Sequence, residues 1–475
     1  MIEDKTSETY FIENEISPNY QNEILNFIHE NYLKIRPEYF QNIEKTQHNG
    51  LDILSFFTRD PVKNYMVETI VEPGNPVEIT LKRDEKTPKE FSDKIKDDLY
   101  FIVHAYEENV LNSTLYFSWV EGEEIIPESP PTPRKRASNR LFSSNLLLIY
   151  VGFFAFNIIL FLFIGLYAVI VILASQFLIV LFADKILARQ SNWRITPENP
   201  YVHILEYQLP LEEFKQFQEK FGNETVIQMK KEIYDRTLAQ KTYPTCEIGD
   251  EVLEKYGFHC NPRSNISKVV NVYEIVKKAA DSFDLPTPKI VISNTMVPNA
   301  AATGPSPSRG LVLITTGLLV HLDEEEILTV VGHEMGHLQG RDPLILFSII
   351  TGEFILRFTI LLPIVLISPL IYIIFAFALI FFVAKFFETR ADLLSAIKIG
   401  KPDILAEALR KIAFKRLQME RVSRSRIPGW LAWDPHPPIY FRIDRLEKMK
   451  TPVEAKNPLI QSAKDVFNGF IAAFK

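Results

Sequence analysis

Two long apolar stretches stand out from an otherwise mixed pattern of hydrophobic and polar positions. Residues 141–183 contain 43 positions without a charged side chain. The charged side chains in residues 344–387 are Glu353, Arg357 and Lys385. As an α-helix, either stretch would extend for about 65 Å, roughly twice the hydrocarbon thickness of a bilayer. Each stretch therefore predicts two transmembrane helices joined by a tight turn, near Gly165 in the first and near Pro369 in the second.

Basic residues flank both predicted hairpins, and neither predicted turn contains one. Arg140 precedes the first hairpin and Lys185 follows it. Arg341 precedes the second hairpin and Arg390 follows it. Basic flanks mark the cytoplasmic side of a membrane protein. The pattern predicts a multi-pass protein of the cell membrane whose N-terminus, C-terminus and soluble parts face the cytoplasm.

The soluble parts begin with a predicted small α+β domain over residues 1–125. Extended patterns at 65–71, 77–81 and 114–120 surround a helical pattern at 89–109. Residues 126–140 are rich in proline and basic side chains, which predicts a linker.

A second soluble domain is predicted in two parts, residues 184–343 and residues 388–455. In the first part, residues 267–283 predict an amphipathic helix and residues 288–293 predict a short strand. Residues 456–475 predict a further amphipathic helix, which is expected either to lie on the bilayer surface or to pack against the soluble domain.

Charge is unevenly distributed along the 475 residues. Residues 1–130 hold 12 basic and 26 acidic side chains, whereas residues 131–475 hold 40 and 33. This division argues against a nucleic-acid-binding protein with one basic face, and it fits a chain whose later part contacts an anionic lipid bilayer. The two cysteines, Cys246 and Cys260, exclude a disulfide framework and a four-cysteine zinc site.

The candidate chemistry lies on a helix that is predicted to begin at residue 323. Asp323 and Glu326 have the spacing of a capping box. Further along, His333 and His337 project from one face of the helix, so both imidazoles can bind one Zn²⁺. Glu334 is offset from that face, where its carboxylate can act as a general base on water. The pattern predicts one zinc ion per chain.

Two glycines, Gly332 and Gly336, lie inside this helix. Each costs about 1 kcal/mol relative to alanine in a helix interior. A surface helix has no need of such a pair. The glycines therefore predict that another backbone approaches the helix closely.

A zinc hydrolase site needs a third protein ligand and an open position. The acidic candidates downstream are Glu353, Glu388 and Glu407. A continuous helix would carry Glu353 about 24 Å from His337, and Glu353 can instead pair with Arg357, four residues later. Glu353 is therefore a weak candidate for the metal site.

The route of the chain favours Glu388. Asp342 and Pro343 have the pattern of an N-cap and a first helical residue, so the chain is predicted to enter the membrane directly after the histidine helix. It then turns and returns to the same face at Glu388, while Glu407 remains a lesser candidate. Asp392 lies one turn beyond Glu388 and can hold a ligand histidine from behind.

Residues 299–304 and 311–315 predict two strands before the histidine helix. An exposed strand edge beside a metal site can bind an extended peptide through backbone hydrogen bonds. An ordinary core hairpin is the alternative.

The order of these motifs resembles that of the HtpX-type membrane metalloproteases. The similar stretch covers about residues 145–450 and includes the segment from His436 to Leu446, and the family shares the gluzincin core of the type I CAAX prenyl proteases. The resemblance implies a multi-pass α-helical membrane protein with a zincin-like α+β catalytic domain, to which this chain adds the separate small α+β N-terminal domain. It also implies that His333, His337 and Glu388 are the zinc ligands and that Glu334 is the general base. Asn299 and Ala300 are implied to belong to the strand that binds substrate.

Two residues far along the chain complete the predicted site. Prolines stiffen the backbone around His436, whose imidazole is expected to donate a hydrogen bond to the carbonyl oxygen under attack. Arg442 is expected to pair with Asp392. The resemblance implies the same two roles, and a surface histidine with a solvated arginine is the alternative.

The prediction is therefore a zinc endopeptidase that cleaves misfolded or membrane proteins on the cytoplasmic side. A prenyl-protein endopeptidase is the second possibility, disfavoured because four spans are predicted where the larger prenyl proteases have seven. A non-catalytic membrane scaffold is the third, and it has no need of Glu334. Protein or peptide substrates and the lipid bilayer are the expected partners, with no nucleic acid, and a partner of the acidic N-terminal domain stays open.

Overall fold

The computed structural model describes residues 6–474 with two longer gaps, 127–154 and 258–264, and short gaps at 15, 17, 49–50, 64, 85, 113, 158, 166, 210, 423–425 and 433. Its contacts form two compact units, Met1–Phe117 with His203–Lys268 and Ser118–Val202 with Val269–Lys475. The predicted linker from residue 127 onward and the predicted first span up to residue 154 lie outside the described residues.

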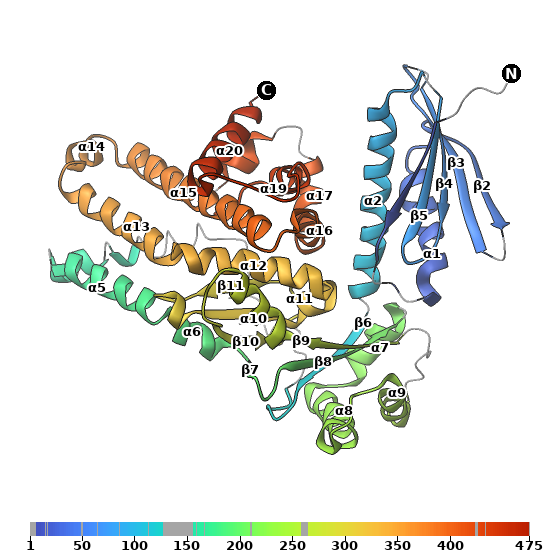
Figure 1. The fold of residues 1–475 in the computed structure, drawn as a ribbon, viewed down its shortest axis with the longest axis horizontal. Coiled ribbons are helices and arrows are strands. Elements are labelled where there is room, and N and C mark those ends of the chain that lie inside the picture. Colours follow the sequence, from blue (N-terminus) through green and yellow to red (C-terminus); the bar gives the residue numbers. More distant parts are fainter. Residues whose placement is uncertain are drawn as a thin grey trace. The chain divides into compact units, whose positions relative to one another are not determined.

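The first unit contains a five-stranded antiparallel sheet in the order β1-β5-β4-β3-β2. Its strands are β1 (Thr6–Ile12), β2 (Phe40–His48), β3 (Leu51–Arg59), β4 (Met66–Glu72) and β5 (Val77–Arg83). Buried and less buried positions alternate along β4, which is typical of a strand with one face on a core. The helices α1 (Pro18–Ile28) and α2 (Lys89–Asn112) share that core with the sheet (Figure 1).

A three-stranded sheet and three helices follow in the described part of the chain. Strands β6 (Thr114–Val120), β8 (Tyr201–Gln208) and β9 (Asn265–Asn271) form a three-stranded sheet in the order β6-β8-β9. The helices of this region are α7 (Leu211–Lys220), α8 (Asn223–Arg236) and α9 (Cys246–Lys255).

The second unit contains a four-stranded sheet in the order β11-β12-β10-β7. The strands are β7 (Trp193–Ile195), β10 (Lys289–Ser293), β11 (Ala300–Thr303) and β12 (Leu311–Thr315). In this sheet β10 and β12 pair in parallel, the other described pairs are antiparallel, and β11 lies at one edge. The predicted strands at 288–293, 299–304 and 311–315 are therefore present.

The predicted helix at 267–283 is wrong in its first part. Residues up to Asn271 belong to β9, and the helix α10 covers Val272–Ser282. The β-branched residues Ile266, Val269 and Val270 favour an extended backbone. Asn271 then starts the helix, because its side chain accepts a hydrogen bond from the Glu274 backbone N–H at 3.0 Å.

Helix α12 (Glu324–Gly340) carries the histidine motif, and its predicted capping box is present. Asp323 accepts from the Glu326 N–H at 2.7 Å, and the Glu326 carboxylate accepts from the Asp323 N–H at 3.0 Å. The helix packs against β11, α10, α15 (Pro369–Lys398) and α16 (Pro402–Ile412). Residues 326–338 of α12, except His337, are consequently buried, which is why its apolar positions show little amphipathic pattern.

Gly332 and Gly336, in the interior of α12, mark the close approach of α15. A Cβ atom on Gly336 would lie 3.1 Å from the Cα of Ala391, and one on Gly332 would lie 2.6 Å from the Ile399 side chain. The predicted neighbouring backbone is therefore α15. Ser395 adds a hydrogen bond of 2.8 Å to the carbonyl of Thr329.

The second apolar stretch forms a hairpin of helices. Helix α13 (Asp342–Phe358) leads through α14 (Leu362–Ile367) into α15, and α13 runs beside α15 (Figure 1). The predicted N-cap at Asp342 is wrong: Arg341 occupies that position with a left-handed backbone (φ 53°), and Asp342 is the first helical residue. This leaves the Asp342 carboxylate free to turn toward α12.

Membrane-spanning potential is clearest in α15, a 30-residue helix that is long and apolar enough to cross a bilayer. Helices α5 (Tyr167–Leu181) and α6 (Ala183–Gln190) are long and apolar enough only when taken together, and a 62° bend lies between them. Among the described residues, these make one or two candidate spans. Helices of this kind also occur in the cores of soluble proteins, so the four-span topology stays a prediction.

The chain continues after α16 through α17 (Phe414–Val422), α18 (Ile427–Leu431), α19 (Ile439–Glu447) and α20 (Pro458–Ala472). Helix α20 packs against α15, and its Gly469 lies against the rings of Phe441 and Trp430. Its opposite face exposes apolar side chains, namely Leu459, Ile460, Phe467 and Ile471, and Phe474 just beyond the helix is exposed as well. One face of the final helix thus packs on the unit, and bilayer contact through the other face stays a prediction.

Candidate metal centre

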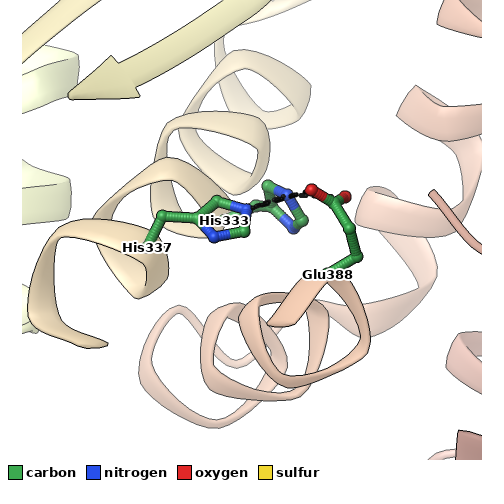
Figure 2. A group of neighbouring side chains, drawn as sticks. All are labelled: His333, His337 and Glu388. Atoms are coloured by element: carbon green, nitrogen blue, oxygen red, sulfur yellow. Dashed lines mark hydrogen bonds and ion pairs between the residues drawn. The ribbon is translucent and has the colours of Figure 1, made fainter. Parts of the chain in front are cut away.

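The two histidines of α12 and one glutamate of α15 meet at a common point (Figure 2). The Nε2 atoms of His333 and His337 are 3.1 Å apart. The Glu388 carboxylate lies 3.6 Å from the first and 3.4 Å from the second. The route predicted from the sequence therefore agrees with the position of Glu388 beside both imidazoles.

These distances fit a tetrahedral zinc ion. Ligand atoms about 2.0–2.1 Å from zinc lie about 3.3–3.4 Å from one another, close to the spacing of these nitrogen and oxygen atoms. Two imidazoles and one carboxylate also form a common donor set of catalytic zinc sites, which leaves a fourth position open. The residues present therefore fit zinc.

A second layer of carboxylates orients both imidazoles. Asp392 Oδ1 lies 2.8 Å from His333 Nδ1, and Asp342 Oδ2 lies 2.8 Å from His337 Nδ1. A carboxylate at Nδ1 favours a proton on that nitrogen, which leaves the Nε2 lone pair available to a metal. The two outer carboxylates thus direct both Nε2 atoms to the common point.

Buried arginines neutralise these carboxylates in turn. Arg442, on α19, donates to both Asp392 oxygens, at 2.9 Å from Nε and 2.7 Å from Nη2. Its Nη1 lies 3.4 Å from Glu388. On the other side, Arg390 donates to Asp342. Bidentate pairing of this kind fixes geometry as well as charge, so Arg442 ties α19 to the metal helices.

The site favours positive charge at its centre. Burial alone would lower the pKa of His337, but its hydrogen bonds to Asp342 and Glu388 outweigh burial and raise the pKa to about 10. The Asp392 and Glu388 carboxylates raise the pKa of His333 above its ordinary value against the same effect of burial. A cation is the species that such surroundings stabilise.

The carboxylate of Glu334 is held by the edge strand. Its Oε2 accepts a hydrogen bond of 2.7 Å from the backbone N–H of Ala302 in β11. Glu334 is 9% exposed, so it lies at the boundary between core and surface. At the start of the same strand, the Asn299 N–H donates to Thr315 Oγ1 at 2.9 Å, and Ala300 pairs with Ile314. The strand predicted to bind substrate therefore lies beside the predicted base.

His436 approaches the centre from the segment before α19. Its Nε2 lies 3.7 Å from Glu388 Oε1, and its Nδ1 lies 3.0 Å from Asp434 Oδ1. Burial would raise the pKa of Asp434, but hydrogen bonds from His436 and the charge of Arg416 lower it to about 2. Asp434 is therefore a carboxylate at neutral pH and accepts the Nδ1 proton of His436.

The lesser candidates for the third ligand lie elsewhere in the described part of the chain. Glu353 contacts Arg357 and Tyr372 within the helical hairpin. Glu407 pairs with Arg410 on α16. Neither belongs to the cluster of metal-binding atoms.

Asp342 was missed as a site residue because its position next to Pro343 also fits an N-cap. Its five-residue separation from His337 was the available signal. We expect Asp342→Asn to weaken zinc binding by ~10–100-fold, because the amide orients His337 less well than the carboxylate. Competition with a chromophoric chelator measures this. Asp403→Asn, at an exposed carboxylate in the first turn of α16, should bind zinc like the wild type, and an unchanged affinity for Asp342→Asn would contradict the orienting role.

Comparisons with known proteins agree with this centre. Residues 268–450 match the model of Peptidase family M48. The "Protease HtpX homolog 2" of Methanosarcina acetivorans is 28% identical over 218 residues, which is 39% of this chain and 74% of that protein. The "Protease HtpX homolog" of Moorella thermoacetica is 33% identical over 164 residues, 30% of this chain and 54% of that protein.

Among solved structures, the crystal structure of S. mikatae Ste24p aligns with 37% of this chain and 48% of its own, at 20% identity and a TM-score of 0.27. A TM-score this low supports no conclusion about the fold. The sequence matches carry the assignment, because the family model spans the strands, the histidine helix, Glu388 and Arg442. Residues 268–450 are thus similar to peptidase family M48, and the resemblance of this chain to the HtpX-type metalloproteases is confirmed.

Proposed function

We propose that this protein is a membrane-embedded, zinc-dependent endopeptidase that cleaves misfolded or membrane proteins on the cytoplasmic side. The observation that carries the proposal is the meeting of His333, His337 and Glu388, with Glu334 on the adjacent position of α12. A structural zinc site is closed by four protein ligands, whereas this set has three. An open position beside a carboxylate base is what hydrolysis requires.

His333, His337 and Glu388 would hold the zinc ion. When bound, zinc supplies a Lewis acid that acidifies water and polarises a carbonyl group. Glu334 removes a proton from the attacking water as the oxygen forms its bond to the peptide carbon. The same carboxyl group then delivers that proton to the leaving nitrogen as the carbon–nitrogen bond breaks. The products are a new carboxyl end and a new amino end.

The edge strand β11 supports this chemistry in two ways. The Ala302 N–H orients Glu334 through their hydrogen bond. The free edge of β11, entered at Asn299 and Ala300, is positioned to bind an extended substrate by backbone pairing. An edge strand that pairs with an extended backbone favours unfolded segments over folded domains as substrates.

His436 and Arg442 complete the proposed machinery. As the peptide carbon is attacked, negative charge grows on its oxygen, and a donor aimed at that atom is worth roughly 2.7–4 kcal/mol. The Nε2 of His436 faces the metal centre, while its Nδ1 is held by Asp434. Arg442 does not need to touch substrate, because it fixes Asp392 and Glu388.

The experiment that tests the function is proteolysis of a panel of unfolded, membrane and prenylated substrates by the purified protein. We expect cleavage of unfolded and membrane segments, loss of cleavage with a zinc chelator, and recovery when zinc is restored. Cleavage confined to prenylated peptides would support the prenyl-protein endopeptidase instead. A protein that holds zinc and cleaves none of the panel would support the scaffold.

The proposed orientation has its own test in intact cells. Cysteines placed at the exposed positions Val62, Glu219 and Glu454 of a cysteine-free variant should react only with reagents that enter the cytoplasm. A cysteine at Ile367, in the turn of the second hairpin and 84% exposed, should react from the opposite side. Labelling of Val62→Cys and Glu454→Cys from opposite sides would contradict the paired-span topology.

A further inference from the structure

Lys385 is a buried cation that the proposed mechanism leaves unused. It lies on α15, three residues before Glu388, and it is 1% exposed. Its ammonium group donates to two backbone carbonyls, that of Ala432 at 3.0 Å and that of Asp434 at 2.6 Å. Burying an ammonium is costly unless its hydrogen bonds are made. The hydrogen bonds to these two carbonyls therefore offset the cost of burying the ammonium group. The same bonds fix the position of the segment before α19.

The segment that Lys385 binds through Ala432 and Asp434 also contains His436. Within it, the Asp434 carboxylate accepts from the His436 backbone N–H at 2.7 Å and from its Nδ1 at 3.0 Å. Arg416 holds the same segment from α17, at 2.9 Å from Asp434 Oδ2 and through bonds to the carbonyls of His436 and Pro437. A chain of polar contacts thus runs from Lys385 through Asp434 to the imidazole.

Packing alone does not hold the imidazole of His436. Its side chain is 46% exposed, whereas that of Glu388 is 13% exposed. A half-exposed ring in a segment without regular structure keeps its place only through directed bonds. Those bonds begin at Lys385, one turn along the helix that also carries Glu388.

We propose that Lys385 is a positioning residue that sets the place of His436 over the metal centre through the backbone and side chain of Asp434. The inference rests on the proposed proteolytic function. Because Lys385 and Glu388 share one helix, a metal ligand and the anchor of the His436 segment belong to the same rigid element. Lys385 itself touches neither the metal-binding atoms nor the substrate edge.

The decisive variant is Lys385→Met, which keeps the length of the side chain and removes its donors. We expect kcat to fall by ~10–100-fold, because a displacement of about 1 Å at a reacting centre has effects of this size. KM and zinc content should stay near the wild-type values. Lys385→Arg, which restores donors at the same place, should recover part of the lost kcat.

A double-mutant cycle with His436→Ala separates positioning from simple destabilisation. His436→Ala alone should lower kcat by ~100-fold. If Lys385 acts through His436, adding Lys385→Met to that variant should cause little further loss, so the two effects are strongly non-additive. Lys411→Met is the matched control, since the Lys411 side chain is also largely buried in this unit, at 9% exposure, but bonds to Glu326 on α12. Its effect should add fully to that of His436→Ala.

The possible results are distinct. A wild-type protein that cleaves no substrate refutes the proposed function itself, before any variant is considered. Normal turnover in His436→Ala refutes the donor role of His436 and the inference together. Loss of zinc from Lys385→Met, or a kcat effect that adds fully to that of His436→Ala, refutes the positioning role while the proteolytic function stands.

Discussion

Glu334→Gln protein is expected to retain its zinc and to cleave peptide bonds ~10²–10⁴-fold more slowly than the wild type. Glutamine has the shape of glutamate, and its amide oxygen can still accept the Ala302 N–H that Glu334 accepts at 2.7 Å. The amide cannot take a proton from water at neutral pH. The loss therefore reports on proton transfer rather than on folding or metal binding.

The measurement is kcat on an unfolded substrate together with zinc content by atomic absorption. Glu325→Gln is the matched control, because Glu325 lies in the first turn of the same helix and pairs with Lys401 at the surface. It should cleave at the wild-type rate. Wild-type cleavage by Glu334→Gln would mean that another group is the base and that the proposed mechanism is wrong.

The second large effect is expected on metal binding. Glu388→Ala and His333→Ala should each lose most of the bound zinc, because two remaining protein ligands hold the ion much more weakly than three. The loss in affinity should exceed the ~10–100-fold that an outer carboxylate contributes. Activity should fall with zinc content and should not return at ordinary zinc concentrations.

Glu407→Ala and Glu353→Gln test the competing assignments in the same assay. Both residues have partners elsewhere, Arg410 for the first and Arg357 for the second. Zinc content should be unchanged in both variants. If Glu407→Ala lost zinc and Glu388→Ala retained it, the third zinc ligand would be Glu407 on α16 and not Glu388.

Local pattern and chain direction were sufficient for much of the candidate site. The sequence predicts the helix start at Asp323 and the shared face of His333 and His337, because both depend only on residue spacing along one helix. The prediction for Glu388 needed only that the chain leave α12, turn and return. Gly332 and Gly336 predicted the close neighbour, and at Gly336 an added Cβ would lie 3.1 Å from the backbone of Ala391, which leaves no room for a side chain.

Some contacts depend on how elements pack, and no spacing encodes them. From the sequence, Asp342 was predicted to be an N-cap. In the structure, the left-handed backbone of Arg341 places the Asp342 carboxylate beside His337 instead. The Ala302 N–H reaches Glu334 because β11 is an edge strand that lies on α12. Ala302 and Glu334 are far apart along the chain, so no local spacing predicts their contact, and the five-residue separation of His337 and Asp342 fits an N-cap as well as the observed contact.

The sequence by itself determined the family resemblance and the histidine helix, and it predicted the carboxylate base and the candidate spans, because each depends on residue spacing or on uninterrupted hydrophobicity. Only the tertiary structure decided which outer carboxylate serves which histidine, and that Lys385 anchors the segment of His436. Directed polar contacts are made at about 3 Å, and their partners are fixed only once helices and loops have packed against one another.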